Sequence, residues 1–184
     1  LTKNLEGNNM TEFGLLQKKG IVAFTDGIKT IQNTRLMSRI MKSAHDLNSL
    51  IIQHAEDLEL SKNGMINDGI IATKLGLQGI PDLAELIIIE RDLTLLESIR
   101  CRYHISQISS KKSVEIISER KNKVKFTCGV SINNLSLNEN DIGDFRTFLK
   151  LSPPLRTEDD RVALVNGLNN NVIDVIVSDH KPED

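Results

Sequence analysis

Short runs of consecutive apolar residues alternate along this chain with stretches in which apolar residues recur at every third or fourth position. Such runs are typical of buried strands, whereas the three-and-four spacing is typical of helices that bury one face. The runs predict strands at residues 21–25, 49–54, 102–107, 123–130 and 172–177. The spacing predicts helices at residues 34–47, 83–99, 110–120 and 158–168. Asp82 is a candidate cap for the longest of these helices.

The alternation of strand and helix predicts an α/β fold with a parallel sheet covered on both faces, either a barrel or a doubly wound sheet. No glycine-rich phosphate loop is present, which weakens the dinucleotide-binding alternative. Five strands in 184 residues fall short of a closed (β/α)8 barrel, which takes about 250 residues. We therefore expect one domain that is a portion of a longer barrel, with exposed sheet edges that disfavour a monomer. Residues 131–157 are expected to form a long functional loop.

Composition excludes several classes of protein. The formal net charge is −2 and the two signs are interspersed, so no basic stripe of the kind that binds nucleic acid is present. No apolar stretch approaches the roughly 18 residues that a membrane span needs. Cys101 and Cys128 are predicted to be buried, reduced thiols rather than a disulfide or a metal site. These features predict a soluble, cytoplasmic protein that binds neither nucleic acid nor membrane.

Two polar side chains stand where predicted strands end. His54 closes the strand at 49–54 and is followed by Glu56, and Asp179 follows the strand at 172–177. Because parallel α/β proteins place their chemistry at the carboxyl ends of the strands, the pair predicts a shared site that could hold a metal ion. The structural alternatives are a His54 hydrogen-bonded to Glu56 or to a carbonyl, and an Asp179 that caps a following helix or turn.

Several motifs, in order along nearly the whole chain, carry a resemblance to a known family. They are Ala23-Phe24-Thr25-Asp26-Gly27, His54-Ala55-Glu56-Asp57, Leu75-Gly76-Leu77-Gln78-Gly79-Ile80-Pro81, Arg102-Tyr103-His104-Ile105, Pro153-Pro154-Leu155-Arg156 and Ser178-Asp179-His180. Through them the chain resembles the dihydroorotases, within the amidohydrolase superfamily of metal-dependent (β/α)8 barrels. The resemblance implies the middle-to-late strands of such a barrel, with the N-terminal strands and the C-terminal part absent from this chain.

The same resemblance implies a function and a set of site residues. It implies reversible hydrolysis of the cyclic amide of dihydroorotate to N-carbamoyl-aspartate, a step of pyrimidine biosynthesis that uses one or two Zn²⁺ ions. His54 would be a metal ligand, and Asp179 both a ligand and the general acid/base. Ser152 and Asn134 would occupy substrate-binding positions. A homo-oligomer is expected.

The departures from the family pattern favour a second hypothesis. Gly27 and Gln107 stand at positions where the family has metal ligands, and Glu183 replaces a histidine. We therefore expect fewer than two Zn²⁺ per chain. Inactive members of this family assemble with aspartate transcarbamoylase, so an inactive, dihydroorotase-like subunit with that partner is the alternative. A related hydrolase acting on a different cyclic amide is a weaker possibility.

The remaining polar residues have open interpretations. Arg156 could clamp a substrate carboxylate, or pair with an acid among residues 158–160. His104 is interpreted as structural, His45 as a surface residue, and His180 as a residue that orients Asp179.

Overall fold

A five-stranded parallel sheet forms the centre of the molecule. The computed structural model describes residues 1–144 and 146–180. The sheet has the order β1-β2-β5-β6-β7 and every neighbouring pair is parallel. Its members are β1 (Ala23–Phe24), β2 (Leu50–Gln53), β5 (Arg102–Ile105), β6 (Thr127–Ser131) and β7 (Val175–Val177). All five predicted strands are confirmed, although each is shorter than its apolar run.

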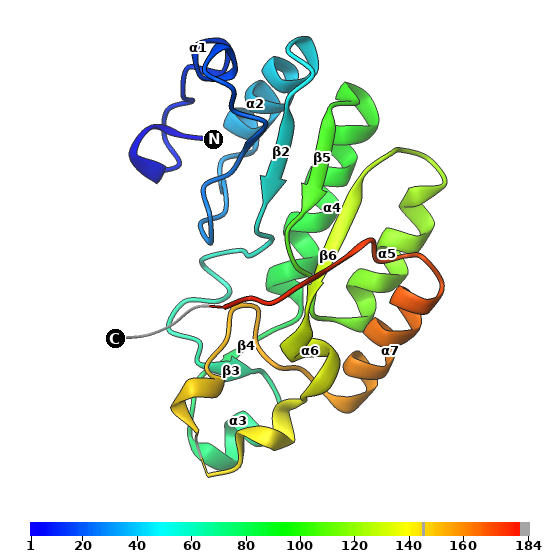
Figure 1. Cartoon of the computed structure of the whole chain (residues 1–184). Coiled ribbons are helices and arrows are strands. Elements are labelled where there is room, and N and C mark those ends of the chain that lie inside the picture. Colours follow the sequence, from blue (N-terminus) through cyan, green and yellow to red (C-terminus); the bar gives the residue numbers. More distant parts are fainter. Residues whose placement is uncertain (145, 181–184) are drawn as a thin grey trace.

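Four long helices lie along one side of this sheet (Figure 1). They are α2 (Thr34–Asp46), α4 (Leu83–Ile99), α5 (Lys111–Lys121) and α7 (Glu158–Asn169). Contacts of α2 with α4, α4 with α5, and α5 with α7 make them a continuous layer. The other face of the sheet is not covered by helices among the described residues, which differs from the predicted coverage on both faces. A parallel sheet with one helix-covered outer face is the arrangement of a partial (β/α)8 barrel.

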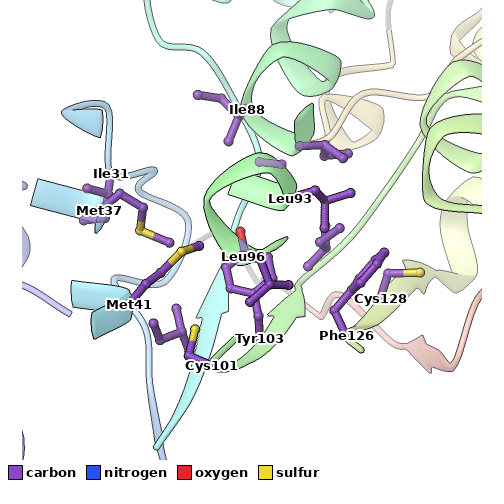
Figure 2. Close-up of a cluster of buried hydrophobic side chains, with 14 of the residues drawn as sticks. Ile31, Met37, Met41, Ile88, Leu93, Leu96, Cys101, Tyr103, Phe126 and Cys128 are labelled. Carbon is purple, nitrogen blue, oxygen red and sulfur yellow. The ribbon is translucent and has the colours of Figure 1, made fainter. Parts of the chain in front are cut away.

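The main core lies between the sheet and the helix layer. Met37 and Met41 from α2, and Leu93 and Leu96 from α4, contact strand residues such as Tyr103 (Figure 2). The spacing of the apolar residues in α2 and α4 places them on the face that meets the sheet. Asn33 caps α2, since its side chain accepts a hydrogen bond from Leu36 N at 2.9 Å.

The predicted cap of α4 is wrong. Asp82 makes no capping hydrogen bond; its carboxylate instead pairs with Lys112 Nζ of α5 at 2.9 Å. Ser110 caps α5, since its side chain accepts a hydrogen bond from Ser113 N. The long helices therefore begin close to the predicted residues, whereas the side chain that satisfies each helix start depends on its neighbours in space.

A smaller unit, which the apolar pattern did not predict, lies beyond the carboxyl ends of the central strands (Figure 1). It contains β3 (Ile66–Asn67), α3 (Ile70–Leu75) and β4 (Gly79–Ile80), with β3 and β4 parallel. The expected long loop at 131–157 is not irregular throughout: it contains α6 (Ile132–Ser136) and 3-10 helices at Glu139–Ile142 and Thr147–Leu149. The two segments share a second core of Ile66, Ala72, Ile142 and Leu155.

The segment before β1 holds a 3-10 helix (Lys3–Leu5) and the short helix α1 (Phe13–Lys18). Phe13 of α1 stacks on Phe24 of β1, with ring centroids 4.0 Å apart. No helix in the described part of the chain has both the length and the apolar character needed to cross a bilayer.

Candidate active site at the carboxyl ends of the strands

Residues from four strand ends, those of β1, β2, β5 and β7, line one cavity of about 250 Å³. His54 directly follows β2, Gln107 follows β5, and Asp179 lies two residues beyond β7; all three line this cavity. The structure thus brings together His54 and Asp179, the two side chains that the sequence singled out, although they lie 125 residues apart in the chain. Their convergence follows from the parallel sheet, in which all strands end at the same edge.

His54 is buried and firmly held. Its side chain and backbone are 3% exposed. Its Nε2 lies 2.9 Å from Glu56 Oε2 and 3.2 Å from Ser152 Oγ. The Ser152 hydroxyl also donates to Glu56 Oε2 at 3.2 Å, so the three side chains form one hydrogen-bonded cluster. The structural alternative for His54, a hydrogen bond to Glu56, is therefore the arrangement found.

The Glu56 carboxylate is stabilised in its charged form. Burial raises its pKa, but hydrogen bonds from His54, Ser61 and Ser152 and the charge of His54 outweigh that effect and hold the pKa below its ordinary value. Glu56 is therefore an acceptor at neutral pH, and its hydrogen bond with His54 fixes the orientation of the imidazole ring. The sequence placed Glu56 beside His54 but did not show that Ser152 completes the cluster.

A second and larger cavity, of about 560 Å³, opens beside the first. Asp179 lines both, and Glu56, Ser152 and Lys150 line the larger one. The larger cavity is therefore lined by one cationic residue, Lys150, and by the acidic residues Glu56 and Asp179. Lys150 is not among the site residues expected from the sequence, because the segment that carries it was expected to be a loop.

Asn134, which the family resemblance placed at a substrate position, lines neither cavity. It lies on α6 and is 3% exposed. Its Nδ2 donates to the carbonyl oxygen of Pro154 at 3.0 Å. Asn134 is therefore tied to the turn that follows Ser152.

Arg156 does not form the predicted ion pair. It is 4% exposed and donates to Ser109 Oγ at 3.1 Å, to Asn67 Oδ1 at 2.8 Å and to the carbonyl oxygen of Ile80 at 2.6 Å. The predicted pair with an acid among residues 158–160 is therefore wrong, whereas the substrate clamp stays a prediction. Through these hydrogen bonds Arg156 joins the two-stranded sheet to the end of β5.

The other histidines lie away from the cluster around His54. His104 Nδ1 is 2.7 Å from Thr127 Oγ1 on the neighbouring strand, in agreement with a structural role. His45 is exposed at the end of α2, with its Nδ1 3.2 Å from the carbonyl oxygen of Arg100. His180 is also exposed. Glu183 lies outside the described residues.

The donor set does not by itself fit a zinc ion. Across residues 1–144 and 146–180, no group of three or more His, Cys, Asp or Glu side chains is placed to hold a metal. The 250 Å³ cavity offers His54 and Asp179, beside Gln107 and Gly27. A catalytic zinc takes three protein ligands, and glutamine is not among its usual donors. Asp26 does not line this cavity, and its carboxylate accepts hydrogen bonds from the backbone N–H and the hydroxyl of Thr2.

Comparison with known proteins gives one family. A family model described as dihydro-orotase-like matches residues 1–113. The dihydroorotases of Ehrlichia canis and Thermoanaerobacter sp. are each 42% identical to this chain, over 179 and 183 residues, which is 96% and 99% of it. The chain spans about 40% of the length of these curated relatives.

Solved structures support the fold. An L-hydantoinase (dihydropyrimidinase) from Arthrobacter aurescens superposes with a TM-score of 0.77 at 23% identity, over 92% of this chain and 40% of that one. A dihydroorotase from Campylobacter jejuni gives a TM-score of 0.65 at 17% identity, over 93% of this chain and 48% of that one. The five-stranded sheet and its helices correspond to part of a (β/α)8 barrel.

Proposed function

The chain belongs to the dihydro-orotase-like family, and on that premise we propose that it is the middle-to-late part of a cyclic-amide hydrolase that interconverts dihydroorotate and N-carbamoyl-aspartate. The observation that carries the proposal is the shared cavity of His54 and Asp179 at the carboxyl ends of the strands. We propose that the protein acts in the cytoplasm, as a homo-oligomer, in pyrimidine biosynthesis.

The proposed chemistry centres on the carboxylate of Asp179. In hydrolysis, Asp179 takes a proton from the water that attacks the ring carbonyl carbon. It then returns this proton to the ring nitrogen as the C–N bond breaks, which leaves a ureido nitrogen and a carboxylic acid that loses its proton to solvent. Ring closure follows the same steps in reverse. General acid–base catalysis of this kind contributes about 10²–10⁴-fold to a rate.

The remaining residues bind and orient the substrate in this proposal. Lys150, on the larger cavity beside Asp179, is placed to attract the carboxylate of dihydroorotate. The Ser152 hydroxyl lies 3.2 Å from His54 Nε2. In this proposal it supplies a hydrogen bond to the reacting edge of the dihydroorotate ring. We propose that Asn134 acts through its hydrogen bond to Pro154, by fixing the turn that bears Ser152.

Zinc is the cofactor that membership of this family suggests, and His54 and Asp179 are its proposed ligands. Two donors fall short of the three that a catalytic zinc requires, so no step is assigned to the ion here. When bound in enzymes, zinc polarises carbonyl groups and lowers the pKa of coordinated water. We expect fewer than two tightly bound zinc ions per chain.

One observation favours a second candidate function. Gln107 and Gly27 face the same cavity as His54 and stand at positions where the resemblance places metal ligands. An inactive, dihydroorotase-like subunit that assembles with aspartate transcarbamoylase would tolerate both residues, because assembly does not require a metal.

A coupled assay for dihydroorotate hydrolysis, with and without added Zn²⁺, separates the two candidates. The first predicts turnover by the complete protein, of which this chain is the proposed part, and at least a 100-fold loss in its His54→Ala and Asp179→Asn variants. His45→Ala is the matched control, since His45 is exposed and remote from the cavity; it should retain full activity. Absence of turnover at every zinc concentration, together with co-sedimentation with aspartate transcarbamoylase, would establish the second candidate.

A further inference from the structure

A second polar cavity lies at the opposite end of the strands from the candidate active site. It has a volume of about 530 Å³, within the range of about 300–1,000 Å³ that is usual for small-molecule sites. Its walls are the turn from α4 into β5, at residues 100–102, and the connection from α5 into β6, at residues 121–125. Both turns lie at the amino-terminal ends of their strands, away from the arrowheads in Figure 1.

The lining of this cavity is strongly basic. Five of its eight lining residues are cationic and, of the described residues, none that lines it is acidic. The cations are Arg100, Arg102, Lys121, Lys123 and Lys125. The chain as a whole carries a formal charge of −2, so this concentration of positive charge is local.

Four of the five cations have no carboxylate partner in the described part of the chain. Lys121 pairs with Asp174 at 2.8 Å. Arg100, Arg102, Lys123 and Lys125 form no ion pair within that part. Arg102 donates only a long hydrogen bond, 3.4 Å, to the carbonyl oxygen of Asn48.

Two of these cations precede the paired residues of neighbouring strands. The parallel pairing of β5 with β6 joins His104 to Thr127 and Ile105 to Cys128, and Arg102 and Lys125 each lie two residues before the first of these pairs. Both side chains are exposed and line the cavity, whereas the alternate residues Tyr103 and Phe126 are buried on the helix side (Figure 2). Like charges gathered around one cavity repel one another, and an anion bound among them would relieve that repulsion.

The helix dipole explains only part of this arrangement. Basic residues at the end of a helix stabilise its negative carboxyl end, which accounts for Lys121 at the end of α5 and for Arg100 directly after α4. Arg102 is on a strand, and Lys123 and Lys125 lie beyond the helix, so the dipole gives no reason for these three.

We propose that this basic cavity binds a small ligand with two or more phosphate groups. Arginine side chains at 100 and 102 supply planar, bidentate donors that match phosphate oxygens, and Lys123 and Lys125 add point charges from the facing turn. The buried residues Cys101 and Val124 form an apolar floor that could accept the base of a nucleotide. The site is separate from the cavity of His54 and does not depend on the proposed activity.

Isothermal titration of the intact chain with inorganic pyrophosphate tests the proposal. We expect saturable binding that weakens as NaCl is raised, because contacts between exposed charges are screened by salt. Lys123→Gln combined with Lys125→Gln should weaken binding at least tenfold. The matched control is Lys18→Gln combined with Lys19→Gln, which changes the net charge equally at exposed residues that do not line the cavity; it should change the affinity less than twofold.

Thermal unfolding supplies an independent measurement. Pyrophosphate should raise the Tm of the wild-type chain, because it binds only the folded state. Without ligand, Lys125→Gln should itself raise the Tm, since it lowers the repulsion among the cations that line the cavity. A tenfold tighter binding of a nucleoside diphosphate than of pyrophosphate would identify a nucleotide site, and equal affinities a polyphosphate site. No saturable binding up to about 1 mM, or equal weakening in the Lys18/Lys19 control, would overturn the proposal.

Discussion

At the scale of single residues, the imidazole of His54 is held through one ring nitrogen. Its Nε2 faces both Glu56 and Ser152, while Gln107 and Asp179 line the same cavity. Neutral imidazole binds zinc through a ring nitrogen, so a metal ion would have to compete with Glu56 for this atom or bind through the other nitrogen. The composition of the cavity therefore controls whether a metal is bound.

Replacing Gln107 tests whether the residues that line this cavity determine metal binding. Gln107→His would give the cavity three donors, His54, the new imidazole and Asp179, which is the number found in catalytic zinc sites. We expect the variant to bind about one more zinc ion per chain than the wild type, measured by elemental analysis after dialysis. Gln78→His, outside this cavity, is the control and should leave the zinc content unchanged. An unchanged content in Gln107→His would mean that His54 and Asp179 do not face a common ion.

The two thiols give a prediction with a defined pH dependence. Burial is the main cause that raises the pKa of Cys101 to about 11 and that of Cys128 to about 12, against an ordinary value of 9.0. Since the thiolate is the reactive form, iodoacetamide at pH 8 should label neither residue in the native chain but both in urea. Because the folded state keeps these protons to a higher pH than the unfolded state, the free energy of unfolding should fall as the pH rises above 9.

Peptide mapping of the alkylated protein checks this prediction. Cys101, which is 6% exposed, should react before Cys128, which is fully buried, as the pH is raised toward 11. Labelling of either native thiol at pH 8 at the rate seen in urea would contradict the assignment of both residues to the core.

The sequence predicted part of the candidate site for a clear physical reason. His54 and Asp179 each follow an apolar run, and the ends of parallel strands meet at one edge whatever the details of the loops. Arg156 could not be interpreted in this way, because its partner Asn67 lies 89 residues away in a unit whose short strands left no periodic signal. Lys150 and Ser152 reach the cavity through a segment whose 3-10 helices have no comparable sequence pattern.

At the scale of secondary structure elements, α4 is joined to two strands by a buried polar network. Asp92 of α4 is fully buried. It accepts hydrogen bonds from Gln53 Nε2 of β2 at 3.0 Å and from the Tyr103 hydroxyl of β5 at 2.7 Å. Arg91 Nη2 pairs with its other oxygen at 2.8 Å. Burial raises the pKa of Asp92, and these partners oppose that shift.

Removing this carboxylate should therefore destabilise the packing of the helix layer on the sheet. Asp92→Ala leaves the donors of Gln53, Tyr103 and Arg91 without an acceptor inside the core. Breaking a buried pair of this kind costs about 3–5 kcal/mol, which urea unfolding would measure as a lower midpoint. Glu90→Ala, an exposed acid on the same helix, should change the stability by less than about 0.5 kcal/mol. Equal effects of the two substitutions would exclude a role for the network.

The elements themselves were predictable where a long periodic pattern exists. Helix α4 begins and ends at the predicted residues 83 and 99, because its apolar spacing is sustained over more than four turns. Shorter elements such as β3 and α3 fell below that length, and their stability comes from the second core that they share with Ile142 and Leu155. Asp82 was misassigned because Lys112, a competing partner for its carboxylate, is distant in the sequence.

At the scale of the whole molecule, the sheet has two open sides. Among the described residues, β1 and β7 each pair with one neighbouring strand only. Large apolar side chains are exposed on or beside these edge strands, including Val22 at 82%, Val175 at 41% and Ile176 at 49%. Unpaired strand edges that carry apolar residues are templates for pairing with another chain. In the longer barrel of which this chain is proposed to be a part, further strands would cover these edges; in the 184-residue chain alone, association with a second copy would do so.

Light scattering coupled to size-exclusion chromatography tests whether β7 mediates association. We expect the 184-residue chain to associate in a concentration-dependent manner, and Val175→Lys to shift it toward the monomer, because a lysine on an edge strand opposes strand pairing. Val162→Lys introduces the same change at a residue of α7 that is 42% exposed, nearly the same as Val175 at 41%, and it should leave association unaltered. If both variants dissociate equally, net charge rather than the strand edge governs association; if the wild-type chain is a monomer at every concentration, the open edges do not mediate it.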